Sequence, residues 1–526
     1  MSGFGDASSE AHGATNWIAE QRRIYFDNAI LVREFRTQLR GIKAPLLLTF
    51  YGGLLTLIAC VFYWGISLTN EQSVAQIQDA LKIFFNVIVY MLEFMVALIA
   101  PALASATIVS EYSRQSIDLL FSSPVGTKYF VIGKAVASFR YVLLLLVLTI
   151  PISAMCVVMG GATWKDVLLT YVFVMVHGVI YMAIALPIAV MTGKAVPAVL
   201  WSYMAGGLYF LISTIPTMAV AFSGFGRGVL TMPPFAGLSP AIAPMAGQYG
   251  TELFGQVVPL VVPTLVIAGL FLRLMMVGTG SILTQAGSKE CCNLRVTSLL
   301  TLLFGTWAIG LASVPWATGV TKGTGSPWAT VVFWCCIPLV FGLPYLSTWS
   351  GSGSLKSWPN GWWNLKLVLR GTPASGLPFL AACMAVATLG AGLGLAGSGS
   401  FSVLDLLYLL GVWSTWFFVW ALGWLCSVPV FRAGHESARR LLAMSLFLTT
   451  MVPLFALSVL EGVLNIGSGT YTPPLLVARF YPFSFFGDPI DRACVKVGVI
   501  VVLGVGVFIL SELKRKKLVA SLRGQL

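Results

Sequence analysis

Residues 83–108 read IFFNVIVYMLEFMVALIAPALASATI, an apolar run in which Glu93 is the one residue that is charged at neutral pH. About 20 apolar residues in a helix cross the hydrocarbon core of a bilayer, which is roughly 30 Å thick. The run therefore predicts a membrane-spanning helix that carries a carboxyl group at membrane depth.

The whole chain has the composition of a polytopic membrane protein. Hydrophobic residues make up 57% of its 526 residues and charged residues only 10%, and the mean hydropathy is +0.88. Soluble domains carry more charge, about 25% of their residues. We therefore expect an all-α fold with about twelve transmembrane helices, at residues 45–68, 83–108, 136–159, 166–191, 196–221, 256–278, 297–318, 328–349, 376–396, 403–430, 441–463 and 494–512.

The placement of lysine and arginine predicts that both termini are cytosolic, because positive charge favours the cytosolic ends of membrane helices. With the N-terminus inside, most of the 32 basic residues fall in cytosolic segments. The formal charge of +13 then reflects a basic face over anionic lipid, and nucleic acid is not an expected partner. The basic residues of the outer segments are Lys82, Lys165, Arg227, Lys322, Arg479, Arg492 and Lys496.

The loops indicate an internal repeat. Pro233 and Pro234 in an outer segment recur as Pro473 and Pro474, 240 residues later. Six spans in each half would give two halves of the same orientation. The outer segment before the last helix of each half is rich in proline and aromatic residues, which favours short broken or re-entrant helices at the outer interface.

The repeat divides the chain into four segments. We expect a cytosolic tail with an amphipathic elbow helix (1–44) and a first six-helix half (45–278). A cytosolic linker (279–295) then leads to a second six-helix half with a basic cytosolic tail (296–526). On the elbow helix, apolar residues share one face while Arg33, Arg36 and Arg40 lie on another, as on a helix in the membrane interface. It is either a simple anchor or a contact for a cytosolic partner.

The segment 111–134, EYSRQSIDLLFSSPVGTKYFVIGK, mixes charges, hydroxyls and a short amphipathic piece between two apolar runs. It has an acidic residue after the second span (Glu111), a Ser-Pro break (Ser123, Pro124) and a Gly-Lys pair (Gly133, Lys134). Together with NAILVREFRTQLRG (28–41), which contains Glu34, this pattern resembles permease subunits of ATP-binding-cassette transporters of the type-2 exporter class. The resemblance covers residues 28–278 and reaches the second half mainly through the 240-residue offset. Gln115 departs from it, because a glycine is expected there.

The resemblance implies a multi-pass protein of the cytoplasmic (inner) membrane of a prokaryote, working with two separate ATPase subunits that bind ATP and magnesium. Further membrane or periplasmic subunits are additional candidate partners. The segment 111–134 would contain a coupling helix that docks in a groove on the ATPase, with its apolar residues buried and its charged residues fixing the orientation. The implied coupling residues are Glu111, Arg114, Ile117, Asp118, Leu120, Phe121 and Pro124. The other interpretation is an amphipathic loop on the lipid surface.

The matching inner loop of the second half, SGSGSLKSWPNGWWNLKLVLRGTPASG (350–376), departs from this pattern because it has no acidic residue and no Ser-Pro. A helix there would place Trp362, Leu365 and Leu369 on one face, with Lys366 and Arg370 one turn apart. We expect a weaker, non-equivalent contact.

Nothing in the sequence predicts catalysis, a cofactor or a metal site in this chain. Neither Gly133-Lys134 nor Gly193-Lys194 has the earlier glycine or the following Ser or Thr of a phosphate-binding loop. The three histidines form no HExxH motif and no cluster. ATP hydrolysis is therefore expected in a partner, and the chain itself is not expected to be an enzyme.

Two ionisable groups are predicted at membrane depth. Glu93 lies 11 residues after Lys82, and His177 lies 12 residues after Lys165, so the two share nearly the same depth. An unpaired charge there costs about 3 kcal/mol, so a partner or a watery cavity is expected. The pair could be a polar point in a translocation path or a structural hydrogen bond between helices, or the two residues could be unrelated.

Three classes of function fit these features. The first is the permease of an ATP-driven transporter, in the export direction. The second is an ion-coupled secondary carrier, against which stand the scarcity of intramembrane charge and the long inner loop. The third is a membrane anchor or assembly subunit without transport. Association with an ATPase separates the first class from the other two.

Overall fold

A computed structural model of the chain describes residues 43–67, 73–113, 127–224, 232, 236–253, 256–283, 289–320, 369, 376–397, 410–411, 414, 418 and 490–523. These residues are almost entirely helical. The chain forms two compact units, one from residues 1–251 and 257–283 and one from residues 252–256 and 284–526.

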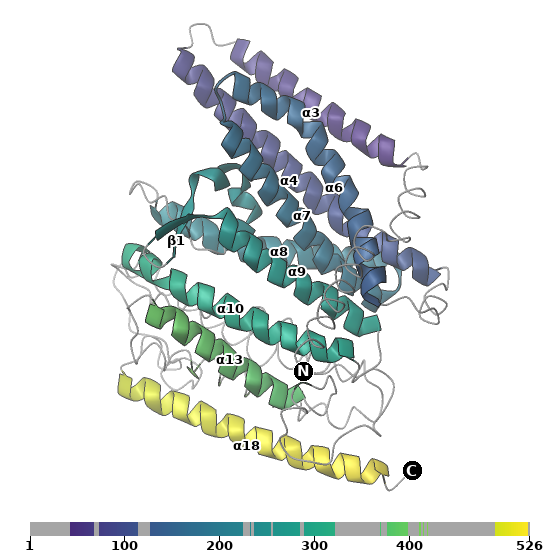
Figure 1. Cartoon of the computed structure of the whole chain (residues 1–526), viewed down its shortest axis with the longest axis vertical. Helices are drawn as coiled ribbons and strands as arrows, with labels where there is room; N and C mark the ends of the chain where they lie inside the picture. Colours follow the sequence, from purple (N-terminus) through teal and green to yellow (C-terminus); the bar gives the residue numbers. More distant parts are fainter. Residues whose placement is uncertain are drawn as a thin grey trace, which may run out of the picture. The chain divides into compact units, whose positions relative to one another are not determined.

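The described residues of the first unit form six long helices: α3 (Lys43–Ser67), α4 (Val74–Ser113), α6 (Thr127–Val158), α7 (Trp164–Thr192), α8 (Ala195–Gly224) and α9 (Val261–Leu283). Helix α7 is at the centre, because it packs against α4, α6, α8 and α9 (Figure 1). Its buried residues lie all around its circumference, from Val167 to Val190. A helix that is apolar on every side is typical of such a central position.

The sequence sets both ends of α7. At its start, Thr163 and Asp166 form a capping box, in which the Asp166 backbone N–H donates to Thr163 Oγ1 at 3.2 Å. At its end, Gly193 adopts a left-handed conformation with φ of 61°, and its N–H donates to the carbonyl of Ala189. Both arrangements satisfy backbone groups that a helix end leaves unpaired.

The proline-rich segment that is predicted to lie on the outer side, hereafter the outer segment, contains two short 3-10 helices, η1 (Ala236–Leu238) and η2 (Pro240–Gln248). A two-stranded hairpin follows, with β1 (Gly250–Leu253) paired to β2 (Gln256–Pro259). The prediction of a span at 256–278 was wrong at its start, because the helix begins at Val261 and ends at Leu283. Val257 and Val258 are β-branched and precede Pro259, which disfavours a helical backbone and leaves the strand as the local structure.

In the second unit the described helices are α10 (Lys289–Val320), α13 (Gly376–Gly397) and α18 (Ile490–Arg523). Helices α10 and α13 pack along one another (Figure 1). They approach closely at Gly390, where an added Cβ would lie 2.3 Å from Thr306 Oγ1. Near one end of the contact, the guanidinium carbon of buried Arg295 lies 4.7 Å from the ring centre of Phe379.

Among the described residues, six helices are long and apolar enough to cross a membrane, which indicates a membrane-embedded protein. The predicted spans at 328–349, 403–430 and 441–463 lie almost wholly outside the described residues. The total of twelve spans and the parallel repeat therefore stay predictions. The six helical segments are Leu48–Gly65, Val74–Glu111, Tyr129–Val158, Trp164–Thr192, Val261–Leu283 and Cys494–Lys514.

Candidate functional site

The structure brings Glu93 and His177 together in the middle of the first unit. Glu93 is on α4 and His177 on α7, and these helices are in contact. His177 Nδ1 lies 2.6 Å from Glu93 Oε1. The side chains are buried, with 4% of Glu93 and 0% of His177 exposed. Their matched depth in the sequence thus corresponds to a direct contact between two helices.

The second ring nitrogen of His177 determines the protonation of the pair. His177 Nε2 lies 3.0 Å from the carbonyl oxygen of Gly237. A carbonyl only accepts hydrogen bonds, so Nε2 carries a hydrogen. One more proton lies between Nδ1 and the Glu93 carboxyl, which gives either a neutral imidazole and a carboxylic acid or an imidazolium and a carboxylate. Both forms have no net charge, which suits a site without bulk water.

The contact with Gly237 is one of several that hold η1 and η2 in place. Three side-chain hydroxyl groups, each from a different helix, donate hydrogen bonds to backbone carbonyl oxygens of this segment. Tyr90 on α4 donates to Ala241 at 3.0 Å, and Thr170 on α7 donates to Ala243 at 3.2 Å. Tyr209 on α8 donates to Leu238. Backbone groups at membrane depth need partners within the protein, and these side chains supply them.

Gly237 lies where the outer segment comes close to both α7 and α9. A Cβ at this position would lie 1.9 Å from Thr264 Oγ1 and 2.7 Å from Phe173 Cε1. No other residue fits without moving one of these neighbours. The close approach places the Gly237 carbonyl within reach of His177.

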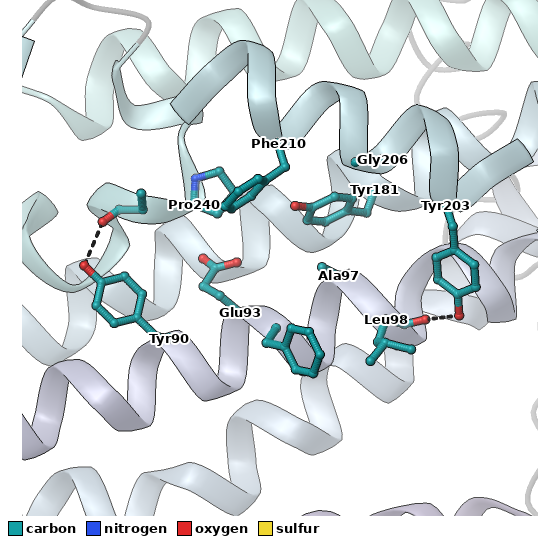
Figure 2. A pocket seen from close by; sticks show the side chains of 12 residues that line it. Tyr90, Glu93, Ala97, Leu98, Tyr181, Tyr203, Gly206, Phe210 and Pro240 are labelled. Carbon is teal, nitrogen blue, oxygen red and sulfur yellow. Dashed lines mark hydrogen bonds between the residues drawn. The ribbon is translucent and has the colours of Figure 1, made fainter. Parts of the chain in front are cut away.

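A cavity of about 610 Å³ lies beside the pair. Figure 2 shows the Glu93 carboxylate in its wall, among aromatic side chains from α4, α7 and α8. Tyr203, on α8, donates from its hydroxyl to the carbonyl of Leu98 on α4 at 2.7 Å, which fixes the ring at one edge. The lining residues are Tyr90, Glu93, Phe94, Ala97, Leu98, Tyr181, Tyr203, Gly206, Gly207, Phe210, Pro240 and Ala241.

A second polar contact lies at the C-terminal end of α4, whereas Glu93 lies near the middle of this helix. Lys134 Nζ of α6 lies 2.8 Å from Glu111 Oε1 of α4, and both side chains are buried. The ion pair joins the last turns of α4 to the first turns of α6, on either side of residues 114–126.

Of the seven predicted coupling residues the structure describes only Glu111, and it places this carboxylate on Lys134, within the protein. The other six, Arg114, Ile117, Asp118, Leu120, Phe121 and Pro124, lie outside the described residues.

The remaining predicted sites fall largely outside the described residues as well. This applies to the elbow helix with Arg33, Glu34, Arg36 and Arg40. In the second inner loop, Leu369 is described as a half-buried helical residue, whereas Trp362, Leu365, Lys366 and Arg370 are not described. Within the described ranges, no three His, Cys, Asp or Glu side chains gather as metal ligands would.

Sequence reasoning missed the hydroxyl groups that hold the outer segment and the partner of Glu111. Tyr90, Thr170 and Tyr209 lie within apolar runs, where a buried hydroxyl needs a hydrogen-bond partner. The sequence could therefore have predicted that these hydroxyls are hydrogen-bonded, but it does not identify the acceptor atoms. Glu111 and Lys134 each lie just beyond a predicted span on the same side of the membrane, so their opposite charges could also have been paired.

Comparison with known proteins adds no identification. The chain matches no protein-family model, no curated protein and no solved structure.

Proposed function

We propose that this chain is the membrane-spanning permease subunit of an ATP-driven transporter of the type-2 exporter class. In this proposal, two separate ATPase subunits bind ATP and magnesium and hydrolyse the nucleotide. The segment 111–134 docks on one of them from the cytosolic side. The proposal combines the sequence resemblance with the geometry at the middle and at the C-terminal end of α4.

The observation that carries the proposal is the buried ion pair between Glu111 and Lys134, 2.8 Å apart. Removing one partner of a buried ion pair costs about 3–5 kcal/mol, because the other charge is left without compensation. The pair therefore ties the ends of α4 and α6 together on both sides of residues 114–126. A displacement of that segment by a docked ATPase would move the two helices as one body.

Helix α4 extends this connection to the polar site. It is continuous from Val74 to Ser113, with Glu111 near its C-terminal end and Tyr90 and Glu93 near its middle. Glu93 is connected to η1 through His177, which contacts both Glu93 and the carbonyl of Gly237. Tyr90 donates a hydrogen bond directly to Ala241 in η2. A shift of α4 would therefore change the hydrogen bonds that hold the outer segment, which is a physical route from ATPase to outer face.

One observation favours a second candidate, a proton-coupled carrier. The Glu93 and His177 pair shares a proton at membrane depth, and such groups are typical of proton relays in transporters. A carrier of this kind would transport in vesicles with a proton gradient and no ATP. The exporter would need ATP and its ATPase subunits.

The test changes the predicted docking surface. Leu120→Ser with Phe121→Ser should release the ATPase or uncouple its turnover, since burying each side chain contributes about 1.5–3 kcal/mol. Leu365→Ser with Leu369→Ser is the matched control and should have a smaller effect. Each protein is purified from native membranes, the co-purifying subunits are identified by mass spectrometry, and ATP hydrolysis is measured in reconstituted vesicles.

Two results decide against the proposal. One is that no ATPase co-purifies with the unchanged protein. The other is that the Leu120 and Phe121 variant, correctly inserted, keeps both the ATPase and its coupled turnover.

A further inference from the structure

Glu93 has one oxygen in use and one without a partner. Its Oε1 is in contact with His177, whereas Oε2 is buried and has no hydrogen-bond partner. A buried carboxylate oxygen without a donor is costly, so its presence points to a group that the chain does not itself supply. Glu93 lines the cavity described above, and Figure 2 shows the carboxylate directed into it.

The rest of the lining is aromatic and apolar. Phe94, Tyr181 and Phe210 line the cavity together with Glu93, and Figure 2 shows the rings of Tyr181 and Phe210 beside the carboxylate. The hydroxyls of Tyr90 and Tyr203 are already used, as donors to Ala241 and Leu98. These two tyrosines therefore present ring surface to the cavity, held in position by their hydrogen bonds.

The size and position of the cavity suit a molecule that comes from the membrane. Its volume of about 610 Å³ is in the range of sites for small organic ligands. Phe94 and Phe210 are 58% and 41% exposed on the outer surface of the helices. In a helix bundle of this composition, such surface faces lipid or another apolar partner, so an apolar molecule can reach the cavity from the bilayer.

We propose that this cavity binds a membrane-soluble molecule that carries a protonated amine on an apolar body. The ammonium group donates a hydrogen bond to Glu93 Oε2, and the apolar body packs on the rings of Phe94, Tyr181 and Phe210. None of the described residues that line the cavity is a lysine or arginine, so no cation of the lining competes for the carboxylate. Aromatic faces also attract a cation that lies near them.

Binding requires no proton to leave the site. In the bound state His177 carries one hydrogen on Nε2, for Gly237, and the shared proton on Nδ1, for Glu93 Oε1. The Glu93 carboxylate then joins the imidazolium through one oxygen and the ligand ammonium through the other. This inference goes beyond the proposed transport function, and it needs neither ATP nor an ATPase.

The test uses the full chain in nanodiscs of phosphatidylcholine and two matched probes. One is dodecylamine with a photoreactive diazirine on its chain, and the other is the corresponding dodecanol. After illumination, the labelled residues are mapped by mass spectrometry as a function of probe concentration. We expect saturable labelling at the cavity by the amine, and only linear labelling by the alcohol from its partition into lipid.

Two variants change the site in different ways. Glu93→Gln keeps a hydrogen-bonding group beside His177 but removes the charge, and it should raise the half-saturating amine concentration about tenfold or more, as expected for a charge-assisted hydrogen bond. Gly207→Leu fills the cavity, since no atom lies within 4 Å of an added Cβ there, and it should abolish saturable labelling. Asp79→Asn removes a carboxylate from an exposed position on the same helix and should leave binding unchanged.

The inference is overturned if the alcohol labels the cavity as saturably as the amine, or if Glu93→Gln and the unchanged protein bind the amine equally. It is also overturned if the Gly207→Leu protein elutes as a folded particle and still shows saturable labelling. The labelling experiment contains no ATP and no ATPase. A failure of this inference is therefore distinct from a failure of the proposed function, which is tested by ATPase binding and turnover.

Discussion

The strongest prediction concerns the energetic coupling between Glu93 and His177. The perturbation is a double-mutant cycle with Glu93→Leu, His177→Leu and the two combined. Leucine keeps a comparable apolar volume and removes the polar atoms. If the two side chains form one polar unit, the effects of the single changes on the free energy of unfolding will not add.

The magnitude follows from the hydrogen bonds that each variant loses. His177→Leu removes both contacts of the ring and leaves the Glu93 carboxyl and the Gly237 carbonyl without partners. At about 1–3 kcal/mol for each buried unsatisfied group, this variant should lose about 2–6 kcal/mol. Glu93→Leu leaves Nδ1 of His177 unpaired and should lose about 1–3 kcal/mol. The double variant leaves only the Gly237 carbonyl unpaired, so it should lose less than His177→Leu alone.

The assay is reversible unfolding in mixed micelles of a mild detergent and dodecyl sulfate, with the free energy of unfolding measured for all four proteins. A second cycle provides the control, using Ser153→Ala and Tyr171→Phe. These hydroxyls lie 2.7 Å apart between α6 and α7 and form a neutral contact. Hydrogen bonds of this kind between membrane helices average about 0.6 kcal/mol. The sum of the two single losses minus the loss of the double variant gives an expected coupling energy of about 2–6 kcal/mol for the Glu93 cycle, larger than in the control.

The reasoning would be refuted if the losses in the free energy of unfolding were additive. If the single effects of Glu93→Leu and His177→Leu sum to the double effect within about 0.5 kcal/mol, the two side chains act independently. In that case the double variant would be less stable than either single variant, whereas a shared polar unit makes it more stable than His177→Leu.

Two further predictions test the outer segment and the orientation of the chain. Gly237→Ala should destabilise the protein by about 1–3 kcal/mol in the same assay, because the new methyl group overlaps Thr264; Gly269→Ala, with open space around its added Cβ, should be close to neutral. In a chain without its native cysteines, Asp118→Cys and Lys366→Cys should react with a membrane-impermeant thiol reagent only from the cytosolic side. Labelling of either cysteine from the outside would contradict the predicted twelve-span topology.

The sequence by itself indicated that this is a membrane protein, and it predicted how deep individual side chains lie along their helices. Composition indicated a membrane protein, and apolar runs predicted helices that include α4, α6 and α7. Since a helix rises 1.5 Å per residue, counting from the nearest basic residue predicted the matched depth of Glu93 and His177. The proline-rich composition of the outer segment indicated that it would not continue as a regular membrane helix, and it forms η1 and η2.

Only the tertiary structure decided which side chains meet around each helix. In a membrane, lipid and protein interior are similarly apolar, so the sequence pattern of a helix such as α7 does not mark the face that packs inward. Packing of α4, α7 and α8 set the rotation that points Tyr90, Thr170 and Tyr209 at the carbonyls of the outer segment. The same packing placed Glu111 on Lys134 and left one oxygen of Glu93 facing a cavity. Depth is a local property of one helix, whereas these contacts depend on the rotation of several helices at once.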